Sequence, residues 1–231
     1  MTHNSWRACS SSAPHPKLGA VSGPGPAPYL DYPPEPMAVA PVTLEGRFVR
    51  LEPLGWEHLD GLIERCADPA LWTHMPEDGA SREGLQRIVA AAVEARGAGR
   101  ELPFATIERA AGQVVGSSRY LSIDARNHRL EIGYTFIARP FQRTAVNTEA
   151  KLLMLGHAFD ALRANRVEFK TDSLNEPSRT AILRLGAQFE GIFRNHMITR
   201  FGRLRHSAYY SITVEEWPAV REALEARLAR G

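Results

Sequence analysis

Hydrophobic residues recur along most of the chain with two spacings, one typical of strands and the other typical of helices. Alternating apolar and polar positions predict strands over residues 43–54, 104–107, 114–123, 128–138, 167–171, 189–200 and 204–214. Apolar positions three and four residues apart predict helices over residues 56–66, 81–96, 147–162, 175–185 and 217–228. This order predicts an α/β sandwich of the α+β type, in which helices cover both faces of one mixed sheet.

The strand expected over residues 128–138 has the clearest division of faces. Leu130, Ile132, Tyr134 and Phe136 occupy alternate positions and are predicted to share one face, which leaves Glu131 on the other face.

Polar residues and a glycine indicate where several helices begin and end. Ser81 is a suitable N-cap for the helix that follows it, and Asn147 or Thr148 is expected to cap the helix over 147–162. Asn175 is expected to cap the next helix, which has proline in its first turn, and Gly186 follows that helix as a stop signal.

Proline is concentrated at the start of the chain, where nine of the 16 prolines fall within the first 41 residues. The rest of this stretch is mainly serine, glycine and alanine, which cannot bury enough apolar surface to offset the entropy of ordering. We therefore expect residues 1–41 to form a disordered tail, either a passive leader or a proline-rich docking arm. Residues 42–231 are long enough for one domain with its own core.

The composition excludes several classes of protein. The 28 basic and 26 acidic residues leave a net charge of +2, which is too small for a chain built to bind nucleic acid directly. No apolar run reaches the ~18 residues of a membrane-spanning helix, and no compact apolar secretory signal opens the chain, so a cytoplasmic protein is expected. Neither the two cysteines, Cys9 and Cys66, nor the eight histidines show metal-ligand spacing, so no metal is expected.

Basic residues gather on the two strands expected over 189–200 and 204–214. They form either a solvated surface or a site for an acidic partner, and no RNA-binding pattern accompanies them. The group comprises Arg194, His196, Arg200, Arg203, Arg205 and His206.

Residues 139–148 connect a strand to the start of a helix. Unpaired N–H groups and the positive end of the helix dipole at such a junction favour a phosphate or a pyrophosphate. Arg143 adds a forked cation, and Thr144 and Thr148 add hydroxyl donors. An ordinary loop before a capped helix explains the same residues equally well.

Two motifs together resemble the GNAT superfamily of N-acetyltransferases. The first is Glu131-Ile132-Gly133-Tyr134 on a strand, followed by Gln142-Arg143-Thr144-Ala145-Val146-Asn147 at the opening of a helix. The second runs from Asn175-Glu176-Pro177-Ser178 through Leu185-Gly186-Ala187. The resemblance covers residues 42 to about 217 and is closest to the branch that contains the ribosomal-protein α-amino acetyltransferases.

The resemblance implies a single GNAT-like domain whose largely antiparallel sheet is splayed between the strand ending near Ile137 and the strand over residues 167–171. Acetyl-CoA, as the co-substrate, would lie in this gap, with its pantetheine against the first strand and its pyrophosphate on the amides of the helix start. The residues implied in binding it are Phe136, Ile137, Gln142, Arg143, Thr144, Ala145, Val146, Asn147, Thr148, Asn175 and Arg179.

Some of these positions have a second interpretation. Ala145 and Asn147 stand where the family pattern has glycine, and both are among the better substitutes for it. Asn175 serves equally as a helix cap or as a ligand of the pantetheine arm. Arg179 either reaches the 3′-phosphate or adenosine end of CoA or is solvated.

Transfer from a thioester to an amine requires a neutral amine and a proton for the departing thiolate. Glu131 is the candidate base, and its alternative role is to order the substrate or to pair with a nearby arginine. Many family members have a proton-donating tyrosine where this chain has Ile182, so Ser178 is the candidate acid, with a simple role near the helix cap as the alternative. Cys66 lies on the apolar side of a helix with no patterned histidine, which favours direct transfer over an acyl-cysteine.

The sequence therefore predicts an acetyl-CoA-dependent N-acetyltransferase that acts on a primary amine, either a small molecule or a protein N-terminus, in a ternary complex. The alternative is a catalytically inactive acyl-CoA-binding regulatory module, which the missing tyrosine and loop glycines motivate. The expected partners are acetyl-CoA and an amine acceptor, and the terminal strands and helix would suit a homodimer.

Overall fold

The fold is that of a computed structural model, which describes residues 32–33 and 35–230. Residues 1–31, 34 and 231 lie outside the described residues, and most of the expected tail, including Cys9, lies there too. The boundary expected at residue 42 is too late, because an apolar side chain before it fills a place in the core. Met37 is 5% exposed, and its amide donates a hydrogen bond to the Ala125 carbonyl at 2.9 Å.

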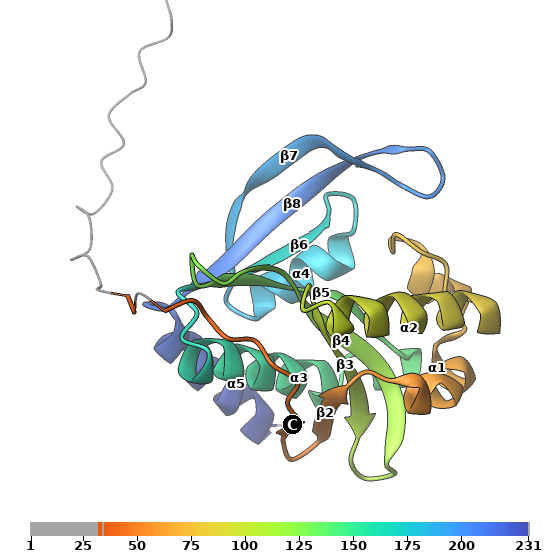
Figure 1. The fold of residues 1–231 in the computed structure, drawn as a ribbon, viewed down its shortest axis with the longest axis horizontal. Helices are drawn as coiled ribbons and strands as arrows, with labels where there is room; N and C mark the ends of the chain where they lie inside the picture. The colour runs from red at the N-terminus through yellow and green to blue at the C-terminus, as the bar shows by residue number, and fades with distance from the viewer. Residues whose placement is uncertain (1–31, 34, 231) are drawn as a thin grey trace, which may run out of the picture. The chain divides into compact units, whose positions relative to one another are not determined.

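One mixed sheet of eight strands forms the centre of the described chain (Figure 1). Its order is β1-β2-β3-β4-β5-β6-β8-β7, and every neighbouring pair is antiparallel except β5 with β6. The strands are β1 (Leu44–Glu45), β2 (Val49–Pro53), β3 (Leu102–Glu108), β4 (Gln113–Asp124), β5 (Arg129–Ile137), β6 (Arg166–Asp172), β7 (Gln188–Ile198) and β8 (Leu204–Thr213).

The single strand expected over residues 43–54 is two short strands, β1 and β2, that pair with each other. A buried carboxylate holds the turn between them. Glu149 accepts hydrogen bonds from the amides of Arg47, Phe48 and Val49 at 2.8, 2.6 and 2.7 Å. This contact joins the turn to a helix about a hundred residues further along the chain, so no local pattern reveals it.

Five helices of the described chain cover both faces of the sheet (Figure 1). One face carries α1 (Leu59–Cys66) and α2 (Arg82–Gly97), and the other carries α3 (Ala145–Gly156), α4 (Glu176–Arg184) and α5 (Trp217–Arg230). A single turn over Trp56–His58 precedes α1, and a π-helical turn over His157–Ala161 continues α3. This is the helix-covered mixed sheet that the sequence predicted.

Two of the predicted helix caps are confirmed. Ser81 Oγ accepts a hydrogen bond from the Gly84 amide at 3.1 Å at the start of α2. Asn175 Oδ1 accepts from the Ser178 amide at 3.1 Å at the start of α4. Both caps satisfy amide groups that the first turn of a helix leaves without partners.

The helix α3 begins earlier than the sequence predicted. It starts at Ala145, and Thr144 is its cap because the Thr144 hydroxyl accepts a hydrogen bond from the Val146 amide at 3.3 Å. Asn147 and Thr148 lie in the first turn, so the prediction that one of them is the cap is wrong. The apolar pattern that located this helix begins further along the chain, and for that reason it missed the first turn.

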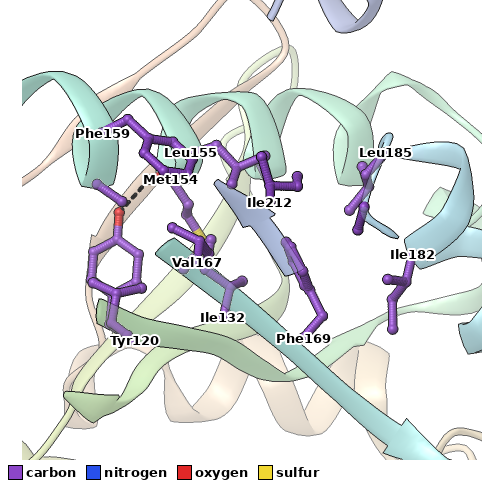
Figure 2. Close-up of a cluster of buried hydrophobic side chains, with 14 of the residues drawn as sticks. Tyr120, Ile132, Met154, Leu155, Phe159, Val167, Phe169, Ile182, Leu185 and Ile212 are labelled. Atoms are coloured by element: carbon purple, nitrogen blue, oxygen red, sulfur yellow. Dashed lines mark hydrogen bonds between the residues drawn. The ribbon is translucent and has the colours of Figure 1, made fainter. Parts of the chain in front are cut away.

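Two hydrophobic clusters hold the layers together. The larger one lies between the sheet and helices α3, α4 and α5, and Figure 2 shows its centre. Within it, the Tyr120 hydroxyl donates to the Met154 carbonyl at 2.6 Å, which joins β4 to α3. The smaller cluster lies between the sheet and helices α1 and α2, around the fully buried Trp72.

A β-bulge in β5 changes which of its residues share a face. Tyr134 has a positive φ of 49°, and the register with β4 shifts so that Tyr134 and Thr135 together oppose one residue. The prediction that Leu130, Ile132, Tyr134 and Phe136 share one face is therefore wrong beyond the bulge. Ile132 packs in the larger cluster, whereas Phe136 packs in the smaller one, on the opposite face of the sheet.

Candidate active site

The strands β5 and β6 separate after only three residue pairs. Their parallel register ends at the pair Glu131 and Glu168. Beyond it, β5 continues to Ile137 and β6 continues to Asp172, but the two strands no longer pair with each other. Along this part of β5, one edge therefore has no neighbouring strand among the described residues, and the sheet is splayed at the place that the family resemblance implied.

The backbone of β5 turns alternate residues toward β4 and toward this open edge. The Ala138 amide donates to the Val115 carbonyl beside β4 at 2.8 Å. By alternation, Phe136 also faces β4, and Ile137 faces the open edge. The Ile137 carbonyl accepts a hydrogen bond from Gln142 Nε2 at 2.9 Å. Of the two residues expected along the pantetheine, only Ile137 presents its backbone groups to the gap.

The loop before α3 uses its own polar side chains to fix its shape. Gln142 holds the Ile137 carbonyl, and the Thr144 hydroxyl donates to the Phe141 carbonyl at 2.7 Å. Arg143 is exposed, has a left-handed backbone with φ of 62°, and makes no ion pair within the described chain. Two expected pyrophosphate ligands, Gln142 and Thr144, are therefore engaged internally, whereas the Arg143 guanidinium is free to meet a ligand.

The first turn of α3 presents unpaired amides directly after this loop. Ala145 and Asn147 are its first and third residues, and within residues 35–230 neither amide donates a hydrogen bond. Both lie in the right-handed helix, so neither needs the left-handed freedom of the glycine in the family pattern. Asn147 Oδ1 is also buried without a partner among the described residues. Free amides at the positive end of a helix suit an anion.

One side chain of α4 that was expected to bind CoA is engaged by other residues of the fold. Arg179 Nε donates to the Tyr210 hydroxyl at 3.0 Å, and Arg179 Nη1 donates to the Ser173 carbonyl at 3.2 Å, so this arginine is not simply solvated. The Ser178 hydroxyl makes no hydrogen bond to another described residue, which leaves it available. Ile182 is 8% exposed and packs in the larger cluster, so a core residue fills the position of the family's tyrosine.

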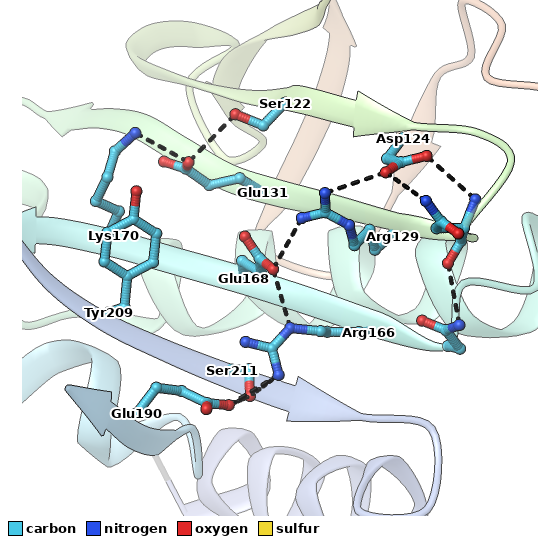
Figure 3. A network of polar contacts seen from close by, with 12 residues as sticks. Ser122, Asp124, Arg129, Glu131, Arg166, Glu168, Lys170, Glu190, Tyr209 and Ser211 are labelled. Carbon is cyan, nitrogen blue, oxygen red and sulfur yellow. Dashed lines mark hydrogen bonds and ion pairs between the residues drawn. The ribbon is translucent and has the colours of Figure 1, made fainter. Parts of the chain in front are cut away.

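Glu131 lies at the point where β5 and β6 separate, on the face opposite to Ile132. It is 4% exposed, and its Oε2 is 3.2 Å from Lys170 Nζ and 3.5 Å from Ser122 Oγ (Figure 3). Burial raises the pKa of the Glu131 carboxyl, and the Lys170 ammonium partly offsets that rise. The other oxygen, Oε1, lies beside Gly133 and accepts no hydrogen bond within the described chain. Glu131 is thus paired with a lysine, not an arginine, and one oxygen remains available.

Other titratable side chains lie beside Glu131 on the same face (Figure 3). Tyr209 of β8 lies next to Lys170, whose Nζ is 5.9 Å from the centre of the tyrosine ring. The Tyr209 hydroxyl is 3.4 Å from His196 Nε2 on β7. Burial, with the positive charges of Lys170 and Arg205, lowers the pKa of His196. The site therefore combines a carboxylate, an ammonium, a phenol and an imidazole.

Comparison with known proteins assigns this geometry to a family. Residues 49–188 match the model of the acetyltransferase (GNAT) domain. The chain belongs to the GNAT acetyltransferase family. This GNAT domain is similar to the crystal structure of a GCN5-related N-acetyltransferase from Brucella melitensis, with 34% identity, a TM-score of 0.78 and coverage of 86% of this chain and 90% of that one.

Two relatives known by sequence agree with this assignment. The GNAT chain is 27% identical over 180 residues to the uncharacterized N-acetyltransferase p20 of Bacillus licheniformis, covering 76% of this chain and 98% of p20. It is 32% identical over 106 residues to YdaF of Bacillus subtilis (strain 168), whose name proposes a ribosomal N-acetyltransferase. That second match covers 46% of this chain and 57% of YdaF.

Two further segments of the GNAT domain approach the face that carries Glu131. The hydroxyl of Tyr134, at the bulge, donates to the Glu77 carboxylate, and the Arg119 guanidinium lies 3.9 Å from the centre of the Tyr134 ring. Near the tip of the β7–β8 hairpin, Arg200 is 3.5 Å from Asp78, so this basic residue is paired. The hairpin carries an open hollow of about 870 Å³ lined by Phe193, Arg194, Asn195, His196 and His206.

Cys66 of the GNAT domain is buried, as its predicted place on the apolar side of a helix suggested. Its Sγ lies 3.7 Å from the Val115 carbonyl, and burial raises its pKa to about 12, so the thiol stays protonated. No group of three or more His, Cys, Asp or Glu side chains in the described part of the chain could hold a metal ion. No helix within residues 35–230 is long and apolar enough to cross a membrane.

Sequence reasoning missed two lysines close to this candidate site. Lys170 pairs with Glu131, and its alternation with Arg166 and Glu168 along β6 was a signal that these polar side chains share a face. Lys151 lies on the buried side of α3, four residues before the buried Leu155. A lysine at a buried helical position is the signal that identifies it.

Proposed function

We propose that this GNAT enzyme transfers an acetyl group from acetyl-CoA directly to a primary amine in a ternary complex. The observation that carries the proposal is the open edge of β5, which is followed by the unpaired amides at the start of α3. The amide-bearing pantetheine arm of CoA suits a strand edge, and its diphosphate suits a helix start. Membership of an acetyltransferase family supports the same reaction.

The acceptor in this proposal is an α-amine of a small molecule or of a protein N-terminus. An α-amine has a pKa near ~8, whereas a lysine amine has a pKa near ~10.4, so the α-amine needs less help to lose its proton at neutral pH. The similarity to YdaF, whose name proposes a ribosomal N-acetyltransferase, supports a protein N-terminus as one of the acceptors to test.

Glu131 is the base in the proposed reaction. Its unpaired Oε1 takes the proton of the acceptor amine as the nitrogen attacks the thioester carbonyl, while Lys170 and Ser122 hold Oε2. The raised pKa of the carboxyl makes it a stronger base than an exposed glutamate. Collapse of the tetrahedral intermediate breaks the carbon–sulfur bond, and Ser178, whose hydroxyl is free, is the proposed donor of the proton that the thiolate takes up.

Binding of the co-substrate is tested by removing one amide of the helix start. Ala145→Pro deletes the free N–H, and proline is well tolerated as the first residue of a helix, after an extended residue such as Thr144. Loss of one hydrogen bond to a charged group is expected to weaken acetyl-CoA binding about 10- to 100-fold in calorimetry. Arg82→Pro makes the same change at the first residue of α2 and is the matched control. Equal affinities in both variants would argue against this binding site.

Turnover is tested by measuring release of free CoA with a panel of small amines and of peptides with free α-amines. Glu131→Gln is expected to lower kcat and to remove the rise of rate with pH that the raised pKa of the carboxyl causes. An unchanged rate across pH would reject Glu131 as the base. Tight binding of acetyl-CoA without release of CoA on any acceptor would indicate an inactive acyl-CoA-binding module instead.

A further inference from the structure

One lysine of the GNAT domain is buried and has no counter-ion among the described residues. Lys151 on α3 is 4% exposed, and no carboxylate among residues 35–230 forms an ion pair with it. Lysines almost never lie fully buried unless they are paired. The chain has three lysines, and the other described one, Lys170, is paired with Glu131. The contacts of Lys151 therefore need a separate explanation.

Lys151 contacts the bulge of β5. Its Nζ donates to Ser118 Oγ at 2.7 Å and to Thr135 Oγ1 at 2.6 Å, and these two oxygens are 2.7 Å apart. Ser118 lies in β4 opposite the bulge, and Thr135 is one of the two bulge residues. Ser118 Oγ also lies 3.4 Å from the Gly133 carbonyl. The amine thus links α3 to both strands of the bulge, just beyond the point where β5 leaves β6.

The packing of α3 does not require an amine at this position. A methionine would occupy a similar volume with no charge to desolvate, and the two hydroxyls already hydrogen bond to each other. Burial alone lowers the pKa of Lys151 to about 7. Glu149, which is also buried on α3, is engaged by the amides of residues 47–49. Above neutral pH, α3 therefore presents a largely uncharged amine to the bulge.

We propose that Lys151 is a positioning residue for acyl transfer, because its amine fixes Thr135 and thereby the peptide groups of the bulge that line the open edge. This inference rests on the proposed function. By alternation along β5, Thr135 turns its N–H and carbonyl groups to the gap, as Ile137 does. A backbone donor beside a thioester carbonyl stabilises the oxyanion only when it is held in place. The hydrogen bond from Lys151 to the Thr135 hydroxyl holds this backbone donor in place.

Protonation changes what Lys151 offers to its two hydroxyl partners. The neutral amine has two N–H groups and a lone pair, so one hydroxyl can donate to it while the other accepts. The ammonium has three N–H groups and no lone pair, and its charge has no partner in the described structure. The groups that face it from β4 and β5 are the hydroxyls of Ser118 and Thr135. We therefore expect kcat to fall as the pH drops through the titration of Lys151.

Lys151→Met and Thr135→Val remove the contact from its two sides, and Met154→Leu, a buried change on the same helix, is the control. The two test variants are expected to lose at least about tenfold in kcat, while KM for acetyl-CoA stays within about twofold. In both test variants, the fall of kcat at low pH that the titration of Lys151 causes is expected to disappear, whereas Met154→Leu is expected to keep it. A wild-type kcat and pH profile in Lys151→Met would overturn the proposal.

A measurement that needs no turnover separates this inference from the proposed function. In ¹⁵N-labelled protein, the amide signals of Gly133, Tyr134 and Thr135 are followed across the titration of Lys151, with and without acetyl-CoA. These signals are expected to titrate together in the wild type and to stay constant in Lys151→Met. If the amide signals of the bulge stay constant across the titration of Lys151, the positioning role is overturned even if the enzyme turns over. If these amide signals titrate with Lys151 but the protein releases no CoA with any amine, the contact between Lys151 and the bulge is supported and the proposed acetyl transfer is rejected.

Discussion

The buried Lys151 makes a quantitative prediction about stability and pH. Its pKa is about 7 in the folded protein and 10.5 in the unfolded chain. Between these values the unfolded state binds more protons than the folded state, so stability rises with pH in this window and is constant below it. A difference of 3.5 pKa units corresponds to about 5 kcal/mol over the whole window. Between pH 7 and pH 9 the rise is about 2 kcal/mol.

Urea unfolding, followed by tryptophan fluorescence at a series of pH values between 7 and 9, measures this rise. For a domain of this size, about 2 kcal/mol corresponds to a shift of the urea midpoint of about 1 M. Lys151→Met is expected to be more stable than the wild type at pH 7 and to lose the dependence on pH, because it has no buried amine to deprotonate. Lys170→Met, which removes the other described lysine, is expected to keep the dependence.

Two results would refute this reasoning. A wild-type midpoint that is flat between pH 7 and pH 9 would show that Lys151 is not neutral in the fold. A rise that persists in Lys151→Met would assign the titration to another group. With three lysines in the chain, a ¹³C NMR titration of the lysine side chains resolves the pKa of Lys151 directly and checks the first of these results.

Three further predictions follow from contacts described above. The Cys66 thiol is expected to resist thiol reagents in the native protein and to react on unfolding, because its pKa is raised to about 12, and rapid native labelling would contradict its burial. Glu149→Gln is expected to cost about 3 kcal/mol in urea unfolding, since it weakens three hydrogen bonds from backbone amides, whereas Glu94→Gln at an exposed pair changes little. Gly133→Ala places a Cβ 2.8 Å from Glu131 Oε1 and is expected to lower kcat about tenfold with acetyl-CoA affinity unchanged. A normal kcat in Gly133→Ala would show that Glu131 Oε1 does not take the proton of the acceptor amine.

The elements that local pattern determines were predictable from the sequence. The caps Ser81 and Asn175 satisfy amides within their own first turns, so three or four consecutive residues contain the whole signal. The order of strands and helices follows from the change of hydrophobic spacing for the same reason. The splayed gap was a different kind of prediction, because nothing local marks an unpaired strand edge, and the family resemblance alone implied it.

The features that were missed depend on contacts between distant segments. The bulge at Tyr134 follows from the register between β4 and β5, which an alternating pattern on β5 alone does not contain. The pairing of Glu131 with Lys170 requires β5 and β6 to lie side by side, and these residues are far apart in the sequence. The hydrogen bonds of Lys151 likewise join three separate elements. Each of these interactions becomes visible only once the sheet order is known.

The short ladder between β5 and β6 divides the sheet into two plates, β1–β5 and β6–β8, that share three residue pairs. The apolar layer beneath the two plates joins them, where Ile132 of one plate and Val167 and Ile212 of the other meet α3 (Figure 2). The ion pairs of Glu131 with Lys170 and of Arg129 with Glu168 also cross between the plates. A ligand bound in the gap between β5 and β6 would add contacts between the two plates where the strands themselves do not pair. We therefore expect the sheet to become more rigid when a ligand is bound in this gap.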